Sequence, residues 1–294
     1  MINNISDIDR KLSIQERLGF NKHAKLLIIQ ADDFGLCHSE NAATIKILEN
    51  HLVSSVSVMV PCAWFSEAMA YVLCRPDTDL GIYLTFNCEW LFYKWGSVAP
   101  LKDVKSMVDD HGYFINNLDV LVKQAKVEEL EIKARAQIEK ILNYGVKVSH
   151  IDNHTMLLLR KPELLELYIK LGKEYKLPVL LSKNLLGNEL QSSVSPDDCT
   201  LDNVYGISIE QYSTIGPENY YESVLKNLPA GVSLLTIHAT YDNLEMQGNA
   251  AFDRMEFGSK WRQQDYDFIT SRRCRQIIED ENIQLNSWKA IKNI

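Results

Sequence analysis

The sequence predicts an α/β protein built on one parallel sheet, closed or nearly closed into a barrel. Short apolar runs typical of buried strands alternate with amphipathic helical segments along the 294 residues. No linker-like stretch divides the chain, so residues 25–294 are expected to form one domain with about seven parallel strands, after an extension over residues 1–24. Polar residues suited to chemistry follow the ends of several apolar runs, as in α/β barrels. A doubly wound open sheet is the alternative class.

The first strand is predicted in the run 25–35, KLLIIQADDFG, because its aliphatic residues do not alternate with polar ones. Such a run is typical of a strand that is covered on both faces. Six further apolar runs predict strands at 55–60, 80–86, 147–152, 179–182, 204–209 and 233–237.

Helices are predicted between these strands. The segment 127–143 has the clearest pattern, with Leu130, Ala134 and Ile138 on one face and charged residues on the other. Pro162 favours the first turn of a helix that runs to Tyr175. The other helices are expected near 39–50, 64–74, 217–228 and 265–280. Irregular structure is predicted for 87–117, which is rich in aromatic residues, glycine and proline, and for 184–204, which has weak periodicity.

Composition narrows the class of protein. The apolar fraction of 46% and the charged fraction of 24% are those of an ordinary soluble globular protein. A net charge of −8 without a basic cluster disfavours nucleic acid as a partner. No apolar run is long enough to span a bilayer, and the N-terminus lacks the features of a signal peptide. The six cysteines form no CxxC pairs, which favours reduced thiols and a cytoplasmic location.

Two adjacent carboxylates, Asp32 and Asp33, end the first predicted strand. Their mutual repulsion favours a site that holds a cation or shares a proton. The alternative is a polar turn, in which an aspartate caps the next helix and Gly35 adopts a positive φ.

Other polar side chains follow later strands. In 148–154, VSHIDNH, alternation places His150, Asp152 and His154 on one face, and imidazoles beside a carboxylate suit a ligand with an acidic partner. A hydrogen-bonded histidine pair in a loop is the alternative. Alternation likewise groups Tyr83, Thr85 and Asn87, and His238 follows the run 233–237, where a lone histidine is more often structural. If the sheet closes, these side chains converge on one mouth.

Aromatic side chains cluster after the strand that carries Tyr83. Trp90, Phe92, Tyr93 and Trp95 could stack on the C–H faces of a sugar in a carbohydrate cleft. The alternative is a local apolar cluster that holds a long loop in place.

These motifs together resemble the YdjC-like carbohydrate deacetylases. The resemblance rests on ADDFG at 31–35, on the GxxLT strand at 81–85 and on HIDNH at 150–154, and it extends over nearly the whole chain. It is closest to a subgroup with segments similar to IQERLG at 14–19, EW at 89–90, YKWG at 93–96 and GSKWRQ at 258–263. It implies a barrel-like fold and metal-assisted removal of acetyl groups from N-acetylated sugars.

The resemblance also implies roles for individual residues. Asp32 is the general base that activates water, and His238 donates a proton to the leaving amine. Asp33 and His154 bind a divalent metal, Zn²⁺ or Mg²⁺. Asn87, His150, Asp152 and Trp90 are placed with Tyr83 around the substrate or behind the metal ligands.

Tyr83 departs from the family pattern, because members have a histidine ligand at this position. A neutral phenol, with a pKa of about 10, ligates only if the metal drives its ionisation. Three outcomes are open: Tyr83 ligates as a phenolate, another group or water fills the position, or catalysis is lost. Two hypotheses follow: a metal-dependent deacetylase of N-acetylated mono- or oligosaccharides with weakly bound or absent metal, or a non-catalytic sugar-binding or regulatory descendant. A hydrolase of a non-carbohydrate amide is a third possibility. The expected partner is a small carbohydrate, with no nucleic acid or membrane, and a homodimer is left open.

Overall fold

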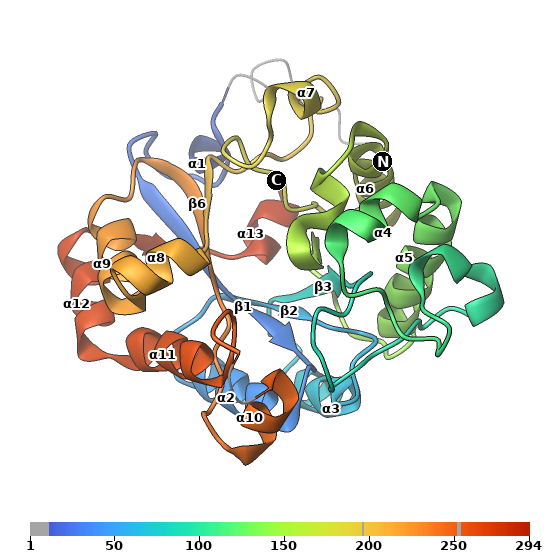
Figure 1. Cartoon of the computed structure of the whole chain (residues 1–294). Coiled ribbons are helices and arrows are strands. Elements are labelled where there is room, and N and C mark those ends of the chain that lie inside the picture. The colour runs from blue at the N-terminus through green and yellow to red at the C-terminus, as the bar shows by residue number, and fades with distance from the viewer. Residues whose placement is uncertain (1–11, 196, 252–253) are drawn as a thin grey trace.

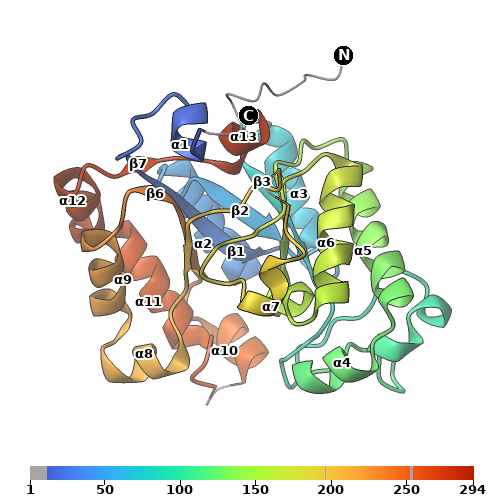
Figure 2. The ribbon, with the colours of Figure 1, turned by 90° about the horizontal axis from the view of Figure 1, so that it is seen from above.

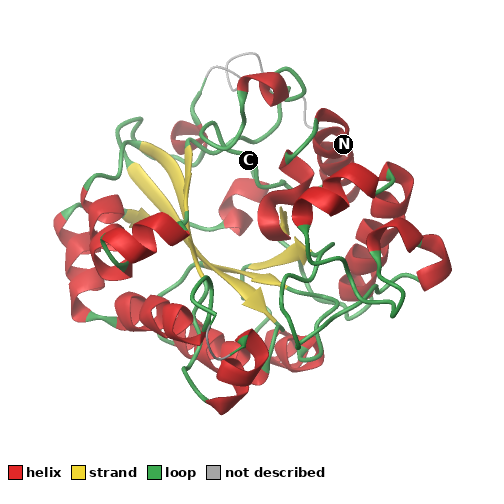
Figure 3. Ribbon diagram, in the orientation of Figure 1, coloured by secondary structure: helices red, strands yellow, loops and turns green. Residues whose placement is uncertain are grey.

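The computed structural model describes residues 12–195, 197–251 and 254–294. It forms a single α/β domain, in which helices surround a curled sheet of parallel strands (Figures 1 and 3), so the barrel-like prediction is confirmed. The strands are β1 (Lys25–Phe34), β2 (Ser55–Val58), β3 (Leu80–Leu84), β4 (His150–Asn153), β5 (Asn203–Tyr205), β6 (Gly231–Ile237) and β7 (Gln284–Leu285). Their order is β4-β3-β2-β1-β6-β5, and β7 pairs with β1 off this path.

The helices lie mostly outside the sheet, as the ribbon shows (Figure 3). Several match the predicted bounds closely, because their amphipathic pattern follows the helical period. The α-helices of the described residues are α1 (Ile14–Arg17), α2 (His38–Glu49), α3 (Phe65–Cys74), α4 (Leu118–Gln124), α5 (Val127–Leu142), α6 (Pro162–Tyr175), α7 (Asn188–Gln191), α8 (Ile209–Thr214), α9 (Pro217–Lys226), α10 (Leu244–Ala250), α11 (Ser259–Thr270), α12 (Arg272–Asp280) and α13 (Trp288–Lys292).

The prediction of one helix over 265–280 was wrong. The helix begins earlier, at Ser259, and Ser271 divides it into α11 and α12. Ser271 has an extended backbone, and its hydroxyl accepts a hydrogen bond from the Cys274 N–H at 3.0 Å. A serine cap of this kind satisfies a free donor at the start of the second helix.

Residues 179–182 link the two edges of the sheet. A strand was predicted here, but the segment forms only isolated parallel bridges, Ile151–Val179 to the β4 side and Ser182–Leu201 to the β5 side. The Leu180 N–H donates to the Ile151 carbonyl at 3.0 Å, and the Leu201 N–H donates to the Leu181 carbonyl at 2.9 Å. The curled sheet is therefore continued through this irregular segment.

Alternate residues of β1 pack into two separate apolar cores. Leu27 and Ile29 belong to the large core that contains the helices, whereas Leu26 and Ile28 belong to a smaller core with Trp288 of α13. Further along the smaller core's side of β1 come Gln30 and Asp32, both buried. Because side chains alternate along a strand, one face of β1 changes from apolar to polar toward its end.

The two ends of the barrel differ in what covers them. Figure 2 shows α1, β7 and α13 at one end, and α4, α8 and α10 at the opposite end, toward which β1 runs. Of the predicted extension 1–24, residues 1–11 lie outside the described residues, and α1 begins after a Ser13–Glu16 capping box. Within the described part of the chain, no helix combines the length and apolar character needed to span a membrane.

Candidate active site

A cavity of 490 Å³ opens at the end of the barrel toward which β1 runs. Strand ends and the loops that follow them supply its lining, as expected for a parallel sheet. The residues that line it are Asp32, Asp33, Tyr83, Asn87, Glu89, Asn116, Leu118, His154, Thr155, Met156, Leu185, Val204, Gly206, Ile207, Thr236, His238, Arg254, Glu256, Phe257 and Arg262.

Asp32 is held at the end of β1 by two hydrogen bonds to one of its oxygens. Gln30 Nε2 donates to Asp32 Oδ1 at 2.8 Å, and Ser57 Oγ donates to the same atom at 2.6 Å. Burial, and after it the negative charge of Asp152, raises the pKa of Asp32 well above its ordinary value. A carboxyl in this environment retains its proton to a higher pH than a solvated aspartate does.

Asp33 faces a different set of partners, because its backbone turns at a φ of 64°. Arg262 Nη2 donates to Asp33 Oδ2 at 2.7 Å, and Arg262 Nη1 contacts Glu40 Oε2 at 3.2 Å. Although burial opposes it, the charge of Arg262, with His238 and His154, lowers the pKa of Asp33. The surroundings therefore shift the pKa values of the two adjacent aspartates in opposite directions.

His154 lies between two carboxylates. Its Nε2 is hydrogen-bonded to Glu89 Oε2 at 3.0 Å, and its Nδ1 lies 3.8 Å from Asp33 Oδ1. Against the effect of burial, Glu89 and then Asp33 raise the pKa of His154. Asp33 Oδ1 and His154 Nδ1 are both buried, and neither has a hydrogen-bond partner among the described residues. Two facing, unpartnered atoms are what a bound ion or water between them would use.

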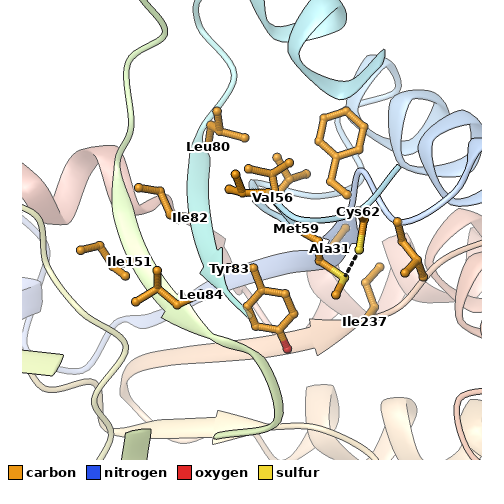
Figure 4. Close-up of a cluster of buried hydrophobic side chains, with 14 of the residues drawn as sticks. Ala31, Val56, Met59, Cys62, Leu80, Ile82, Tyr83, Leu84, Ile151 and Ile237 are labelled. Atoms are coloured by element: carbon orange, nitrogen blue, oxygen red, sulfur yellow. Dashed lines mark hydrogen bonds between the residues drawn. The ribbon is translucent and has the colours of Figure 1, made fainter. Parts of the chain in front are cut away.

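Tyr83 borders the same space. Its ring meets that of His154 edge to face, with centroids 5.1 Å apart. In Figure 4 the ring lies beside buried aliphatic side chains and its oxygen points away from those that are labelled. Burial, followed by the charge of Asp32, raises the pKa of Tyr83 well above its ordinary value. The side chain is therefore a neutral phenol.

These residues do not complete the three-ligand set that a catalytic metal ordinarily has. The separation of 3.8 Å between Asp33 Oδ1 and His154 Nδ1 is compatible with two ligand distances of about 2.0–2.2 Å. Tyr83, where the resemblance implies a third ligand, is a neutral phenol, and Glu89 is hydrogen-bonded to the far side of His154. Within the described residues, no group of three His, Cys, Asp or Glu side chains could hold a metal ion.

His238 follows β6, the strand next to β1. Its backbone N–H donates to Asp265 Oδ2 at 3.0 Å, and its ring meets that of Phe257 edge to face at 4.8 Å. Burial, opposed by the charge of Asp33, lowers the pKa of His238 to about 4. At neutral pH the imidazole of His238 is therefore uncharged.

Three of the residues that we expected around the substrate or behind the metal ligands, His150, Asp152 and Trp90, do not line the cavity. His150 stacks on Trp288 with centroids 4.7 Å apart and an interplanar angle of 18°. Asp152 accepts a hydrogen bond from Gln30 Nε2 at 2.7 Å, below the cavity. Trp90 packs under the Arg262 guanidinium, which lies 5.4 Å from its ring centroid, in an aromatic cluster with Tyr93 and Trp95. Strand alternation predicts that His150 and Asp152 share one face of β4, but it does not predict how far their side chains lie from the cavity.

Thr85 also lies away from the cavity, since β3 ends at Leu84 and alternation stops there. The Thr85 N–H donates to Gln137 Oε1 of α5 at 3.0 Å. Asn87 does reach the cavity, where Thr155 Oγ1 donates to Asn87 Oδ1 at 2.8 Å. Thr155 and Met156 both have positive φ values, 57° and 54°, immediately after His154. Such conformations are costly for residues with a Cβ and occur mostly at functional sites.

Sequence reasoning missed Arg262 and Glu89 as cavity residues. A signal for Arg262 was available, because Arg262, Asp265 and Ile269 share the i, i+3, i+7 face of α11 with large apolar neighbours. Charged residues on the buried face of a helix are costly unless paired, so this spacing indicates a specific partner. Glu89 lies in an irregular loop, so no periodic pattern predicts which way its side chain points.

The comparisons with known proteins agree with this architecture. A "Carbohydrate deacetylase" of Thermus thermophilus is 28% identical over 290 residues, covering 96% of this chain and 98% of that protein. Another, of Thermoanaerobacter pseudethanolicus, is 23% identical over 268 residues, covering 91% and 100%. A solved structure from Enterococcus faecalis, provisionally described as a cellobiose-phosphate cleavage protein, has a TM-score of 0.78 at 22% identity and covers 91% of this chain and 99% of its own, which shows a shared fold. The model of the family described as "YdjC-like protein" matches residues 26–280, and this chain therefore belongs to the YdjC-like family.

Proposed function

We propose that this protein removes acetyl groups from N-acetylated mono- or oligosaccharides, and that Tyr83 weakens both its divalent-metal binding and its turnover. The observation that carries the proposal is the convergence of Asp32, Asp33, His154 and His238 on one cavity. The names of its relatives, carbohydrate deacetylases of similar length, support the same reaction.

The residues present suit the proton transfers of amide hydrolysis. Asp32, once ionised, accepts a proton from the attacking water, with Oδ1 already occupied by Gln30 and Ser57. His238, on the neighbouring strand, passes a proton to the leaving amine. Arg262 holds Asp33 and balances part of the negative charge in the cavity. Both transfers require protonation states opposite to those favoured by burial.

A direct test is acetate release from N-acetylglucosamine and from short chitooligosaccharides, with and without added Zn²⁺ or Mg²⁺. We expect slow release by the wild type, increased by metal, and almost none by Asp32→Asn. Failure of the wild type and of a Tyr83→His variant to release acetate with either metal would reject a sugar deacetylase.

Tyr83 also favours a second candidate, a non-catalytic sugar-binding or regulatory descendant. The cavity persists, while the ligand set falls short of three. Elemental analysis of protein purified without chelator, combined with calorimetry against N-acetylglucosamine and chitobiose, separates the two. Saturable sugar binding without acetate release or metal supports the binding protein. A cytoplasmic location and a homodimer remain predictions alongside either function.

A further inference from the structure

We propose that Gln30 is a positioning residue for Asp32, and that Trp288 and the His150–Asp152 segment set the orientation of its amide. This inference rests on the proposed deacetylase function for its catalytic consequence. Its structural part, a single hydrogen-bonded chain from Trp288 through Gln30 to two carboxylates, stands independently of any activity.

The orientation of the Gln30 amide follows from the chemistry of its partners. An indole N–H can only donate, so Trp288 Nε1, at 2.9 Å, requires the amide oxygen to face it. The NH₂ group then faces Asp32 Oδ1 at 2.8 Å and Asp152 Oδ2 at 2.7 Å. Carboxylate oxygens accept, and the amide supplies two donors. Both ends of Gln30 therefore agree on one orientation, and a flipped amide would turn its NH₂ group toward the indole N–H, which is also a donor.

Trp288 is itself fixed from the other side. It is fully buried, and its ring stacks on His150. His150 Nδ1 is hydrogen-bonded to Ser149 Oγ at 2.8 Å. The opposite edge of its imidazole lies against Gly81, where an added Cβ would come within 2.2 Å of Nε2. His150 is therefore confined between β3 and α13, which leaves the indole little freedom to turn.

The network leaves one oxygen of Asp32 for chemistry. Both hydrogen bonds that Asp32 accepts from described residues, from Gln30 and Ser57, go to Oδ1. Oδ2 is thus the atom available on the cavity side, and rotation of the carboxylate would break both bonds. The HxDxH motif then has two roles: His154 lies in the cavity, whereas His150 and Asp152 support Asp32 from below. The alternative is that these hydrogen bonds only satisfy buried polar groups and do not orient Asp32.

The structural part is tested by the indole ¹H–¹⁵N resonances of the intact protein, with the Trp288 signal assigned by Trp288→Phe. Asp32→Asn should shift the Trp288 resonance through Gln30, and Gln30→Met should shift it further. Asp33→Asn, one residue away but outside the network, should leave it in place. Trp64, which is exposed and has no contact with Gln30, Asp33 or Arg262 among the described residues, serves as the internal reference. Equal shifts from Asp32→Asn and Asp33→Asn, or none from either, would overturn the network.

The catalytic part is tested by acetate-release kinetics. Loss of an orienting partner typically costs about 10- to 100-fold in activity, so Gln30→Met should lower kcat by that factor with KM nearly unchanged. Ser233→Ala is the matched control, because Ser233 is buried on β6 and its hydroxyl has no partner in the described part of the chain. If Gln30→Met does not fold, Asp152→Asn is tested in its place, and we expect it to lower kcat by a smaller factor.

The outcomes separate the two proposals. A wild type that releases no acetate rejects the deacetylase, and with it the catalytic role of Gln30, while the resonances still decide the network. An active wild type whose kcat is unchanged by Gln30→Met rejects the positioning role, even where the Trp288 resonance confirms the network.

Discussion

Tyr83 is the residue whose replacement should change this protein most. Imidazole ligates at neutral pH without ionisation, whereas burial and neighbouring carboxylates keep the phenol protonated. We expect Tyr83→His to raise divalent-metal affinity and acetate release, each by about 10-fold or more. Equilibrium dialysis with metal analysis and an acetate assay measure the two effects.

Tyr83→Phe is the control, because it removes the hydroxyl without adding a ligand and should gain neither property. A wild type that already holds one tightly bound metal equivalent, and gains nothing from Tyr83→His, would show that Tyr83 does not impair the site.

Asp32 and Asp33 should respond differently to the same substitution. Asp32→Asn removes the group that accepts the proton from water, so acetate release should fall to nearly zero while metal content stays unchanged. Asp33→Asn should lower both. It also leaves Arg262 with Glu40 as its remaining carboxylate, and breaking a buried pair costs about 3–5 kcal/mol of stability. Metal content, acetate release and urea midpoints of both variants check this, and equal metal loss in the two would show that the assigned roles are wrong.

At the scale of elements, the packing of β3 against β4 depends on the absence of a side chain at residue 81. Gly81 lies opposite His150 in the parallel register, and a Cβ there would come within 2.2 Å of the ring. We expect Gly81→Ala to destabilise the protein by about 1–3 kcal/mol, because His150 has no room to withdraw from Trp288. Gly206→Ala is the control, since nothing lies within 4 Å of its added Cβ. Similar urea midpoints for the two variants would contradict this account.

The sequence predicted most strands and helices because their patterns reflect local geometry. Pro162–Tyr175 was predicted to the residue, and β1 ends at its carboxylates as expected. Other features depend on contacts between distant residues, which no local pattern encodes. Three features belong to this group: the hydrogen bond from Arg262 to Asp33, the stacking of His150 on Trp288, and the bridges formed by residues 179–182. The site was therefore predicted as a set of strand ends, without the helix residues that complete it.

For the whole molecule, buried carboxyls link stability to pH. Burial raises the pKa of Asp265 to about 7, whereas an aspartate in an unfolded chain has a pKa of about 3.9. Between these values the folded state holds a proton that the unfolded state has lost. The stabilisation is therefore fully present below about pH 4 and is lost as the pH rises through about 7. Asp152, whose pKa is also raised to about 7 by burial, acts in the same direction.

Asp265→Asn mimics the protonated carboxyl and should remove its part of this dependence. We expect wild type to lose up to about 2 kcal/mol more than the variant between pH 5 and pH 7, measured by urea unfolding. Asp242→Asn is the control, because hydrogen bonds from Ser259 and Gln247 lower the pKa of Asp242 and move its effect below this window. Parallel curves for wild type and Asp265→Asn would show that Asp265 is ionised in the folded state.

The distance along the chain between the partners of β1 has a consequence for biosynthesis. Arg262 follows Asp33 by 229 residues, and Trp288 follows Gln30 by 258. At roughly 5–20 residues per second, a ribosome adds Arg262 about 10 to 50 seconds after Asp33. Throughout that interval Asp33 lacks the Arg262 cation, and Gln30 beside Asp32 lacks the indole that orients its amide. The carboxylates translated first must stay hydrated until the last helices arrive, so a nascent chain stalled before residue 262 has no assembled site.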